Sequence, residues 1–196
     1  MPMKRISSRL LNKRMLLLPA TLAIPPHAAM LGIGTDIVYL PRFAKIVEKH
    51  APVGQSTTFR KIATKFMHPE EVRHLYQMLQ LGYNSPSVVR YLAGVWATKE
   101  AIFKSLAAQR LEIPLLPAQK IYTQVFYKTN EQDGAPRVEF DSSIERLHPE
   151  FARAYIANTR FVLSIAHDED YLVSFVCHIR GQAAENVVQK TPRPFS

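Results

Sequence analysis

The sequence predicts an α+β fold. Three patterns indicate it: an apolar stretch with two glycines at 31–38, a long segment of helical periodicity at 87–109, and hairpin-like segments at 121–140 and 160–179. Strands and helices do not alternate regularly along the chain, as they would in a parallel α/β protein. We therefore expect a small sheet that packs against the long helix.

The first half of the expected domain is mostly helical. A strand at 31–38 leads into a helix with Pro41 in its first turn, where the missing N–H costs nothing. Residues 51–58 are polar and predict a loop. Apolar residues between 62 and 79 then favour one or two helices, interrupted near Pro69.

The clearest helix spans 87–109, and Pro114 and Pro117 follow it. A period of 3.6 residues is kept by Val88, Leu92, Val95, Trp96, Lys99, Ile102, Phe103 and Leu106. We expect Trp96 and Phe103 to lie in the core. Lys99 lies near the apolar side, so it is expected to snorkel, with its stem along the apolar surface and its ammonium in solvent.

A first hairpin is expected after this helix. Residues 121–128 alternate like a strand, Asp133-Gly134 is a strong turn signal, and 137–140 form the returning strand. These features predict a two-stranded antiparallel unit.

A helix and a second hairpin complete the expected domain. Residues 142–158 favour a helix that opens with a Ser142…Glu145 capping box and is broken or restarted at Pro149. Segments 160–167 and 171–179 carry the β-branched and aromatic residues typical of strands.

Composition excludes several classes of protein. The 196 residues are 47% hydrophobic and 21% charged, so the chain has enough apolar surface to fold. A single cysteine, Cys177, excludes an internal disulfide framework and a cysteine-based zinc cluster, and we interpret it as a small buried hydrophobe. No stretch reaches 18 apolar residues, so stable membrane insertion is not expected.

The net charge of +9 is concentrated near the N-terminus. Residues 1–29 combine basic residues, serines and leucines, and the first acidic residue is Asp36. This composition indicates a mitochondrial targeting presequence. The alternatives are a secretory signal with its apolar core at 15–24 and a disordered arm that binds nucleic acid. We expect the folded domain to span 30–180 and a polar, disordered tail to span 181–196.

Two places favour a metal and phosphate site. Gly32 and Gly34 precede Asp36 at the end of the first predicted strand, and they leave space beside a carboxylate for a ligand. An aspartate that caps the next turn is the alternative. Glu100 and Lys104 share one face of the long helix at i,i+4, and the alternative for them is a solvent-exposed ion pair.

Taken together, these residues indicate phosphoryl transfer. Asp36 and Glu100 would supply two hard oxygen ligands, and Mg²⁺ typically takes one or two carboxylates together with water and substrate phosphates. Lys104, one turn beyond Glu100, would reach a phosphate oxygen. His167 ends the strand predicted at 160–167 and is either a hydrogen-bonded structural residue or a catalyst.

The residues resemble one family, the holo-acyl-carrier-protein synthases, which are short 4′-phosphopantetheinyl transferases. Gly-Ile-Gly-Thr-Asp-Ile-Val at 32–38 looks like their opening motif, and 91–104, with Trp-Ala-Thr-Lys-Glu-Ala inside it, resembles their signature helix. Three further segments are similar to family motifs in the same order: 66–71 with Glu71, 133–138 and 163–167. The resemblance covers about 31–178. It implies the 4′-phosphopantetheinyl transferase fold, an antiparallel or mixed sheet packed against a long helix.

The resemblance also implies a reaction, the transfer of 4′-phosphopantetheine from coenzyme A to a serine of apo-acyl carrier protein, with release of 3′,5′-ADP. It places the catalytic Mg²⁺ ligands at Asp36 and Glu100 and the phosphate-contacting lysine at Lys104. His167 falls near the coenzyme A site, and the general base stays open between Glu100, a metal-positioned water and His167.

The same resemblance assigns docking of the carrier protein to Arg42. Lys45 follows on the same helix face and is a candidate for the same role, with a solvated helix face as the alternative. The bacterial members are homotrimers with sites between subunits, which implies a homotrimer here. With the presequence, the expected location is the mitochondrial matrix and the expected carrier is the mitochondrial one.

The chain departs from the family pattern in several places, and two of them bear on its activity. Val95 stands where an arginine is usual, and residues 107–110 replace a Gly-Thr-Gly turn. A catalytically inactive relative that only binds acyl carrier protein is therefore the alternative function. A basic nucleic-acid-binding protein is a second alternative. We expect no nucleic-acid partner, because the basic excess is modest beyond residue 29 and no RNA-binding motif is present.

Overall fold

The computed structural model describes residues 29–50, 57–82 and 85–181. The predicted presequence and tail lie outside these residues except for Ala29 and Gly181, and so does most of the loop predicted at 51–58.

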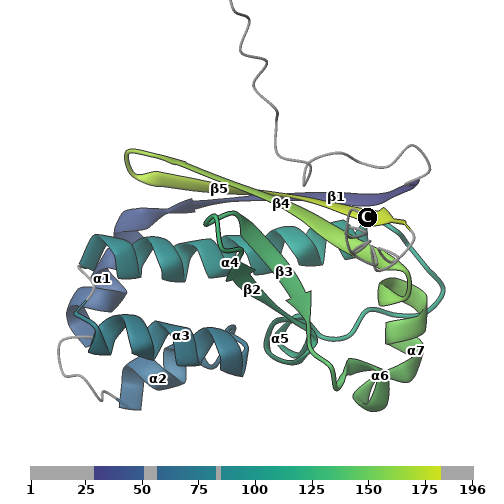
Figure 1. Ribbon diagram of the computed structural model, residues 1–196, viewed down its shortest axis with the longest axis horizontal. Coiled ribbons are helices and arrows are strands. Elements are labelled where there is room, and N and C mark those ends of the chain that lie inside the picture. Colours follow the sequence, from purple (N-terminus) through teal and green to yellow (C-terminus); the bar gives the residue numbers. More distant parts are fainter. Residues whose placement is uncertain (1–28, 51–56, 83–84, 182–196) are drawn as a thin grey trace, which may run out of the picture.

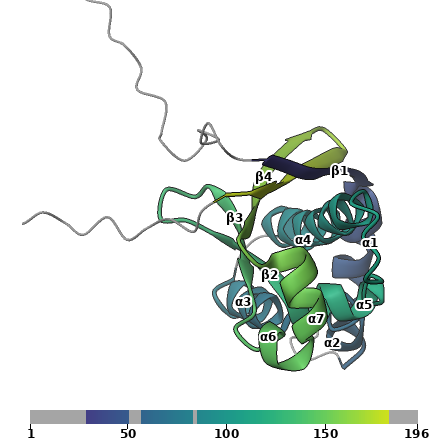
Figure 2. The ribbon, with the colours of Figure 1, turned by 90° about the vertical axis from the view of Figure 1, so that its right-hand side faces the viewer.

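A three-stranded antiparallel sheet covers one side of a long helix (Figures 1 and 2). Its strands are β1 (Ala29–Tyr39), β5 (Tyr171–Arg180) and β4 (Thr159–Asp168), in that spatial order. The helix is α4 (Ser85–Ala107), and most of its side chains are buried because β1 and β5 cover it on one side and α1 and α3 contact it on another. The predicted fold class and the long helix are confirmed.

Helix α1 (Leu40–His50) continues from β1 and contacts α4 near one of its ends, and helices α2 (Thr57–Ala63) and α3 (Pro69–Gln80) lie on the side of α4 away from the sheet (Figure 1). The interruption predicted near Pro69 is confirmed. His68 caps α3 in a capping box, in which its ring accepts from the Glu70 N–H while Glu71 accepts from the His68 N–H.

The segment predicted as a strand at 121–128 is only half extended. Its first part is a π-helix, η2 (Ile121–Val125), which follows the short α5 (Ala118–Lys120). Extended structure begins only with β2 (Phe126–Asn130), which pairs with β3 (Pro136–Phe140) across the predicted Asp133-Gly134 turn. The strand predicted from alternation is therefore wrong for 121–125. These residues form a π-helix, which buries Ile121, Tyr122 and Val125 together.

The helix predicted at 142–158 is three short pieces, α6 (Ile144–Leu147), α7 (Pro149–Phe151) and η3 (Ala152–Ile156). The predicted Ser142…Glu145 capping box is wrong. Ser143 is the N-cap and makes no side-chain cap bond. Its N–H and hydroxyl instead donate to Asp141 Oδ1 at 2.7 and 2.5 Å, so Asp141, the first residue after β3, organises this turn.

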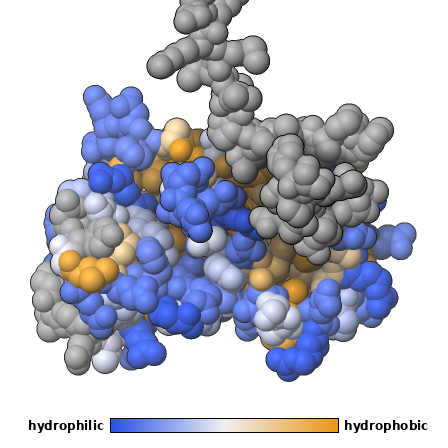
Figure 3. Space-filling model, viewed as in Figure 1, coloured by the Kyte–Doolittle hydropathy of each residue, from blue (hydrophilic) through white to orange (hydrophobic). Residues whose placement is uncertain are grey.

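The two faces of the three-stranded sheet differ in what covers them. The inner face packs on α4, whereas the outer face of β1 and β5 leaves large apolar side chains exposed. We call this set the outer sheet face: Ile33, Ile37, Tyr39, Tyr171, Val173 and Phe175. Much of the rest of the surface is hydrophilic in the view of Figure 3. No helix among the described residues is both long and apolar enough to span a membrane.

Candidate functional site

Two glycines let β1 run directly against α4. A Cβ at Gly34 would lie 1.8 Å from the Ala101 carbonyl oxygen, and one at Gly32 would lie 2.0 Å from the Ser105 carbonyl oxygen. Any other residue would therefore push the strand off the helix. This close approach brings Asp36, the next inward-facing residue of β1, to the exposed edge of α4.

Asp36 pairs with Lys104 of that helix. Lys104 Nζ lies 2.8 Å from Asp36 Oδ1 and donates to the Thr35 carbonyl at 3.0 Å. The lysine side chain is 48% exposed and the aspartate side chain 15% exposed, so the pair lies at the surface of the site. The alternative pairing of Lys104 with Glu100 is wrong, because the lysine turns toward β1 instead.

Glu100 accepts a hydrogen bond from a residue that lies outside the sequence motifs described above. The Tyr122 hydroxyl donates to Glu100 Oε1 at 3.0 Å. Burial raises the pKa of Tyr122, and the charges of Glu100 and Asp36 raise it further, so the hydroxyl keeps its proton and acts as a donor. Tyr122 thus holds the Glu100 carboxylate, while Lys104 pairs with the Asp36 carboxylate of β1.

A fully buried ion pair lies behind this surface. Lys99 Nζ is 2.9 Å from Glu71 Oε2 and donates to the carbonyls of Tyr122 and Phe126 at 2.7 and 2.6 Å. Glu71 also accepts from the N–H groups of His68 and Lys128. The expected snorkelling of Lys99 is wrong. Burial lowers the pKa of Lys99, but the Glu71 carboxylate and the two carbonyls stabilise its charge inside the core.

The donor set fits a hard divalent cation. Asp36 and Glu100 each have one oxygen that accepts a bond from a side-chain donor, Lys104 and Tyr122 respectively, and each has a second oxygen. The ammonium on Asp36 shows that the site holds positive charge. The described residues contain no group of three or more His, Cys, Asp or Glu side chains that could hold a metal. Two carboxylates suit Mg²⁺, which completes its coordination with water and substrate phosphates.

The predicted docking residues lie on α1, which continues directly from β1. The Arg42 guanidinium lies over the rings of Phe43 and Trp96, 5.1 and 5.6 Å from their centroids. Arg42 and Lys45 are exposed, and Trp96 is half-buried. The first turn of α1 therefore presents a cation that is held on aromatic faces, six residues after Asp36 in the chain.

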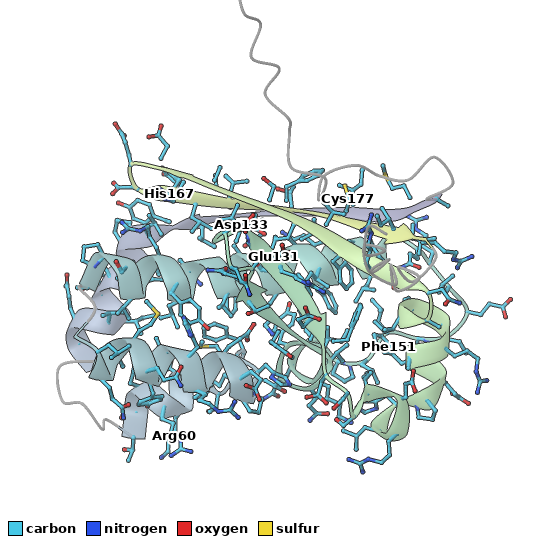
Figure 4. The ribbon with its side chains drawn as sticks, viewed as in Figure 1. Arg60, Glu131, Asp133, Phe151, His167 and Cys177 are labelled. Carbon is cyan, nitrogen blue, oxygen red and sulfur yellow. The ribbon has the colours of Figure 1, made fainter. Side chains whose placement is uncertain are left out.

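His167 is not part of this cluster within one chain. The strand register aligns it with Leu172 of β5 and, through β5, with Val38 of β1, two residues beyond Asp36. Since β5 lies between β4 and β1, His167 is about 10 Å across the sheet from β1. It is exposed near the β4–β5 turn (Figure 4).

Residues 32–176 match the family model described as the 4′-phosphopantetheinyl transferase superfamily. The chain belongs to this family. It is 39% identical over 153 residues to the mitochondrial holo-[acyl-carrier-protein] synthase of Saccharomyces cerevisiae, covering 73% of this chain and 88% of that protein. It is 41% identical over 155 residues to the enzyme of the same name from Eremothecium gossypii, covering 78% and 81%.

Solved structures support the transferase fold. A holo-ACP-synthase from Plasmodium yoelii has a TM-score of 0.53 at 20% identity and covers 79% of this chain and 98% of its own. An ACPS–CoA complex from Chronobacterium ammoniagenes also has a TM-score of 0.53, at 24% identity, and covers 79% and 99%.

In this phosphopantetheinyl transferase chain, the two departures from the family pattern have definite places. Val95 is fully buried in α4, where an arginine would need a partner for its charge. The turn after α4 is closed by Arg110 in a left-handed conformation, with φ of 49°. Sequence reasoning missed Tyr122, and no local signal pointed to it, because its role depends on the π-helix that carries it.

Proposed function

We propose that this chain transfers 4′-phosphopantetheine from coenzyme A to a serine of apo-acyl carrier protein, giving the holo-carrier and 3′,5′-ADP, with Mg²⁺ as cofactor. The observation that carries the proposal is the pairing of Lys104 of α4 with Asp36 of β1, with Glu100 one helical turn before Lys104 and held by the Tyr122 hydroxyl. The names of the yeast relatives support the same reaction.

Asp36 and Glu100 would hold the cation, which when bound neutralises charge on the pyrophosphate of coenzyme A. Lys104 is half exposed, so its ammonium can move from Asp36 to phosphate oxygens and stabilise the leaving 3′,5′-ADP. The serine oxygen forms a bond to the β-phosphorus as the bond to the 3′,5′-ADP oxygen breaks. The serine proton passes to a general base, for which Glu100, a water beside it and His167 are the candidates.

Arg42 and Lys45 are proposed to dock the carrier protein. Acyl carrier proteins are acidic, and exposed cations beside the site steer an acidic partner and fix its orientation. The aromatic rings under Arg42 reduce the number of positions that its guanidinium takes before docking.

We propose that the chain forms a homotrimer in which the outer sheet face is the interface between copies. Soluble monomers rarely leave large contiguous apolar patches exposed, and this set includes Ile37 at 63% and Tyr171 at 51% exposure. Burial of this face between copies would also explain the position of His167. His167 lies apart from Asp36 of its own chain, and in a trimer it would face coenzyme A bound to a neighbouring copy.

The proposed location is the mitochondrial matrix, with the mitochondrial acyl carrier protein as substrate. The mitochondrial relatives support this location, and so does the composition of residues 1–29. Fluorescence of the full chain fused to a reporter, compared with the same fusion lacking 1–29, tests it. Reporter signal outside mitochondria for both fusions would contradict it.

Intact-mass spectrometry tests the reaction. Apo-acyl carrier protein is incubated with the full chain, coenzyme A and Mg²⁺, and we expect a mass gain of one phosphopantetheine. The gain should disappear with Glu100→Ala, with Asp36→Ala or with EDTA. If a folded chain gives no gain on a carrier that another transferase modifies, the chain is instead an inactive relative that binds the carrier.

A further inference from the structure

We propose that Tyr122 is a positioning residue that holds the Glu100 carboxylate in place for a divalent cation. The inference deepens the proposed function and rests on it, because it concerns the same Asp36 and Glu100 site. It adds a residue from a third element, η2, to a site otherwise built from β1 and α4.

Tyr122 is held at both ends by consecutive residues of α4. Its backbone carbonyl accepts from Lys99 Nζ at 2.7 Å, and its hydroxyl donates to Glu100 Oε1 at 3.0 Å. Lys99 is itself fixed by Glu71 in the core. The position of the hydroxyl is therefore set by the buried pair, and the pair acts on Glu100 through Tyr122.

The surroundings of the ring keep it in one orientation. Tyr122 is 6% exposed and packs edge-to-face against Phe103 of α4, with ring centroids 6.1 Å apart. A π-helix places Ile121, Tyr122 and Val125 on one buried side, and such segments frequently occur at functional sites.

The hydrogen bond has two effects on Glu100. It uses one lone pair of Oε1 and fixes the plane of the carboxylate, so Oε2 is the oxygen more open to a cation. It also holds Glu100 away from Lys104, which is one helical turn along α4 and would otherwise attract it. Lys104 thereby stays with Asp36 and close to the position of the substrate phosphates.

Binding of Mn²⁺ to the full chain tests the proposal without measuring turnover. Mn²⁺ is a hard cation that takes the same oxygen ligands as Mg²⁺, and the electron paramagnetic resonance signal of the free aqua ion reports the unbound fraction. Tyr122→Phe removes the hydroxyl and keeps the ring. We expect its Mn²⁺ affinity to fall about 10-fold or more, as for other hydrogen-bonded partners of metal ligands.

Tyr155→Phe is the matched control. Tyr155 is buried to a similar extent, and its hydroxyl donates to the Ile113 carbonyl at 2.6 Å, away from the site. This variant should keep the wild-type Mn²⁺ affinity. Tyr122→Leu separates the packing of the ring from the hydrogen bond. If the role of Tyr122 is purely structural, Tyr122→Leu should lose thermal stability and Mn²⁺ affinity, whereas Tyr122→Phe should keep both.

Asp36→Ala and Glu100→Ala test the metal site separately from the role of Tyr122. If both lose Mn²⁺ binding while Tyr122→Phe binds like the wild type, the role of Tyr122 is wrong and the metal site stands. If none of the three changes Mn²⁺ affinity, the metal site and the role of Tyr122 are both wrong.

Discussion

The ammonium of Lys99 lies 2.9 Å from the carboxylate of Glu71, and both side chains are fully buried. Their remaining hydrogen bonds go to backbone groups of the N-terminal end of α3, of η2 and of β2. The pair therefore joins four elements at one point, directly behind Glu100 and Tyr122. Its geometry leaves neither charge without a partner in the core.

Removal of one member of this pair should be severe. Lys99→Met leaves Glu71 as an uncompensated buried charge, so the free energy of unfolding should fall by about 3–5 kcal/mol. Urea denaturation followed by circular dichroism measures it. The double variant Lys99→Met/Glu71→Gln should be less destabilised than the sum of the two single variants, and strict additivity would show that the charges do not interact.

Gly34 should tolerate no side chain. An added Cβ would meet the Ala101 carbonyl oxygen at 1.8 Å, so Gly34→Ala should cost about 3 kcal/mol of stability or more, as overpacked sites do. The control is Gly94→Ala in α4, where the nearest atom would be 3.9 Å away. This variant should stabilise the protein by about 0.5–1 kcal/mol, the usual gain for Ala over Gly in a helix. Thermal melts of both variants measure the difference, and similar melting temperatures would contradict the close approach of β1 to α4.

Lys104 should matter for transfer and hardly for stability. Its ion pair with Asp36 is half exposed, and such pairs contribute at most about 1 kcal/mol. Lys104→Met should therefore melt close to the wild type and lose about 100-fold or more in kcat, the usual scale for a lost donor to transition-state charge. Steady-state kinetics on the carrier check it. A variant with wild-type kcat would remove Lys104 from the reaction.

Acid should destabilise the protein through His178. This side chain is fully buried, its Nδ1 lies 2.9 Å from the Gln109 amide nitrogen, and burial lowers its pKa to about 4, with Arg180 adding to the shift. The folded state thus favours the neutral ring. Its stabilising contribution is complete above the unfolded pKa of about 6.5 and is lost as the pH falls from 6.5 toward 4, by about 1.4 kcal/mol per pH unit.

The variant His178→Gln tests this, because glutamine stays uncharged and can accept from Gln109. Its stability should fall less steeply between pH 6.5 and 4 than that of the wild type. Some slope should remain, since burial also lowers the pKa of His68. His167→Gln, at an exposed histidine, is the control and should follow the wild-type profile. Equal slopes for wild type and His178→Gln would refute the assignment.

A charge on the outer sheet face should prevent assembly. Ile37→Glu should reduce the mass measured by sedimentation from that of three copies to that of one, because burial of an unpaired carboxylate is costly. Leu81→Glu is the matched control. Leu81 is even more exposed, at 75%, but follows α3, away from the sheet. If both variants sediment like the wild type, the outer sheet face is not the interface.

The sequence by itself determined the helices and strands in which buried apolar residues recur at a regular spacing. The strand containing Asp36, the long helix with Glu100 and Lys104, and the two hairpins all follow from local apolar spacing and turn residues. The structure confirms these elements, except that 121–125 are π-helical and the first hairpin begins at Phe126. Asp36, Glu100 and Lys104 were also found from the sequence, because their motifs resemble those of one family in the same order.

Only the tertiary structure decided which partners the charged groups take. Lys99 has the spacing of an apolar-side residue, yet its partner Glu71 is 28 positions away on another helix, and Lys104 pairs across 68 positions with Asp36. Tyr122 reaches Glu100 only because η2 is a π-helix and not the strand that alternation predicted. Periodicity reports which side of an element is buried, whereas the partner of a buried charge depends on packing between distant segments.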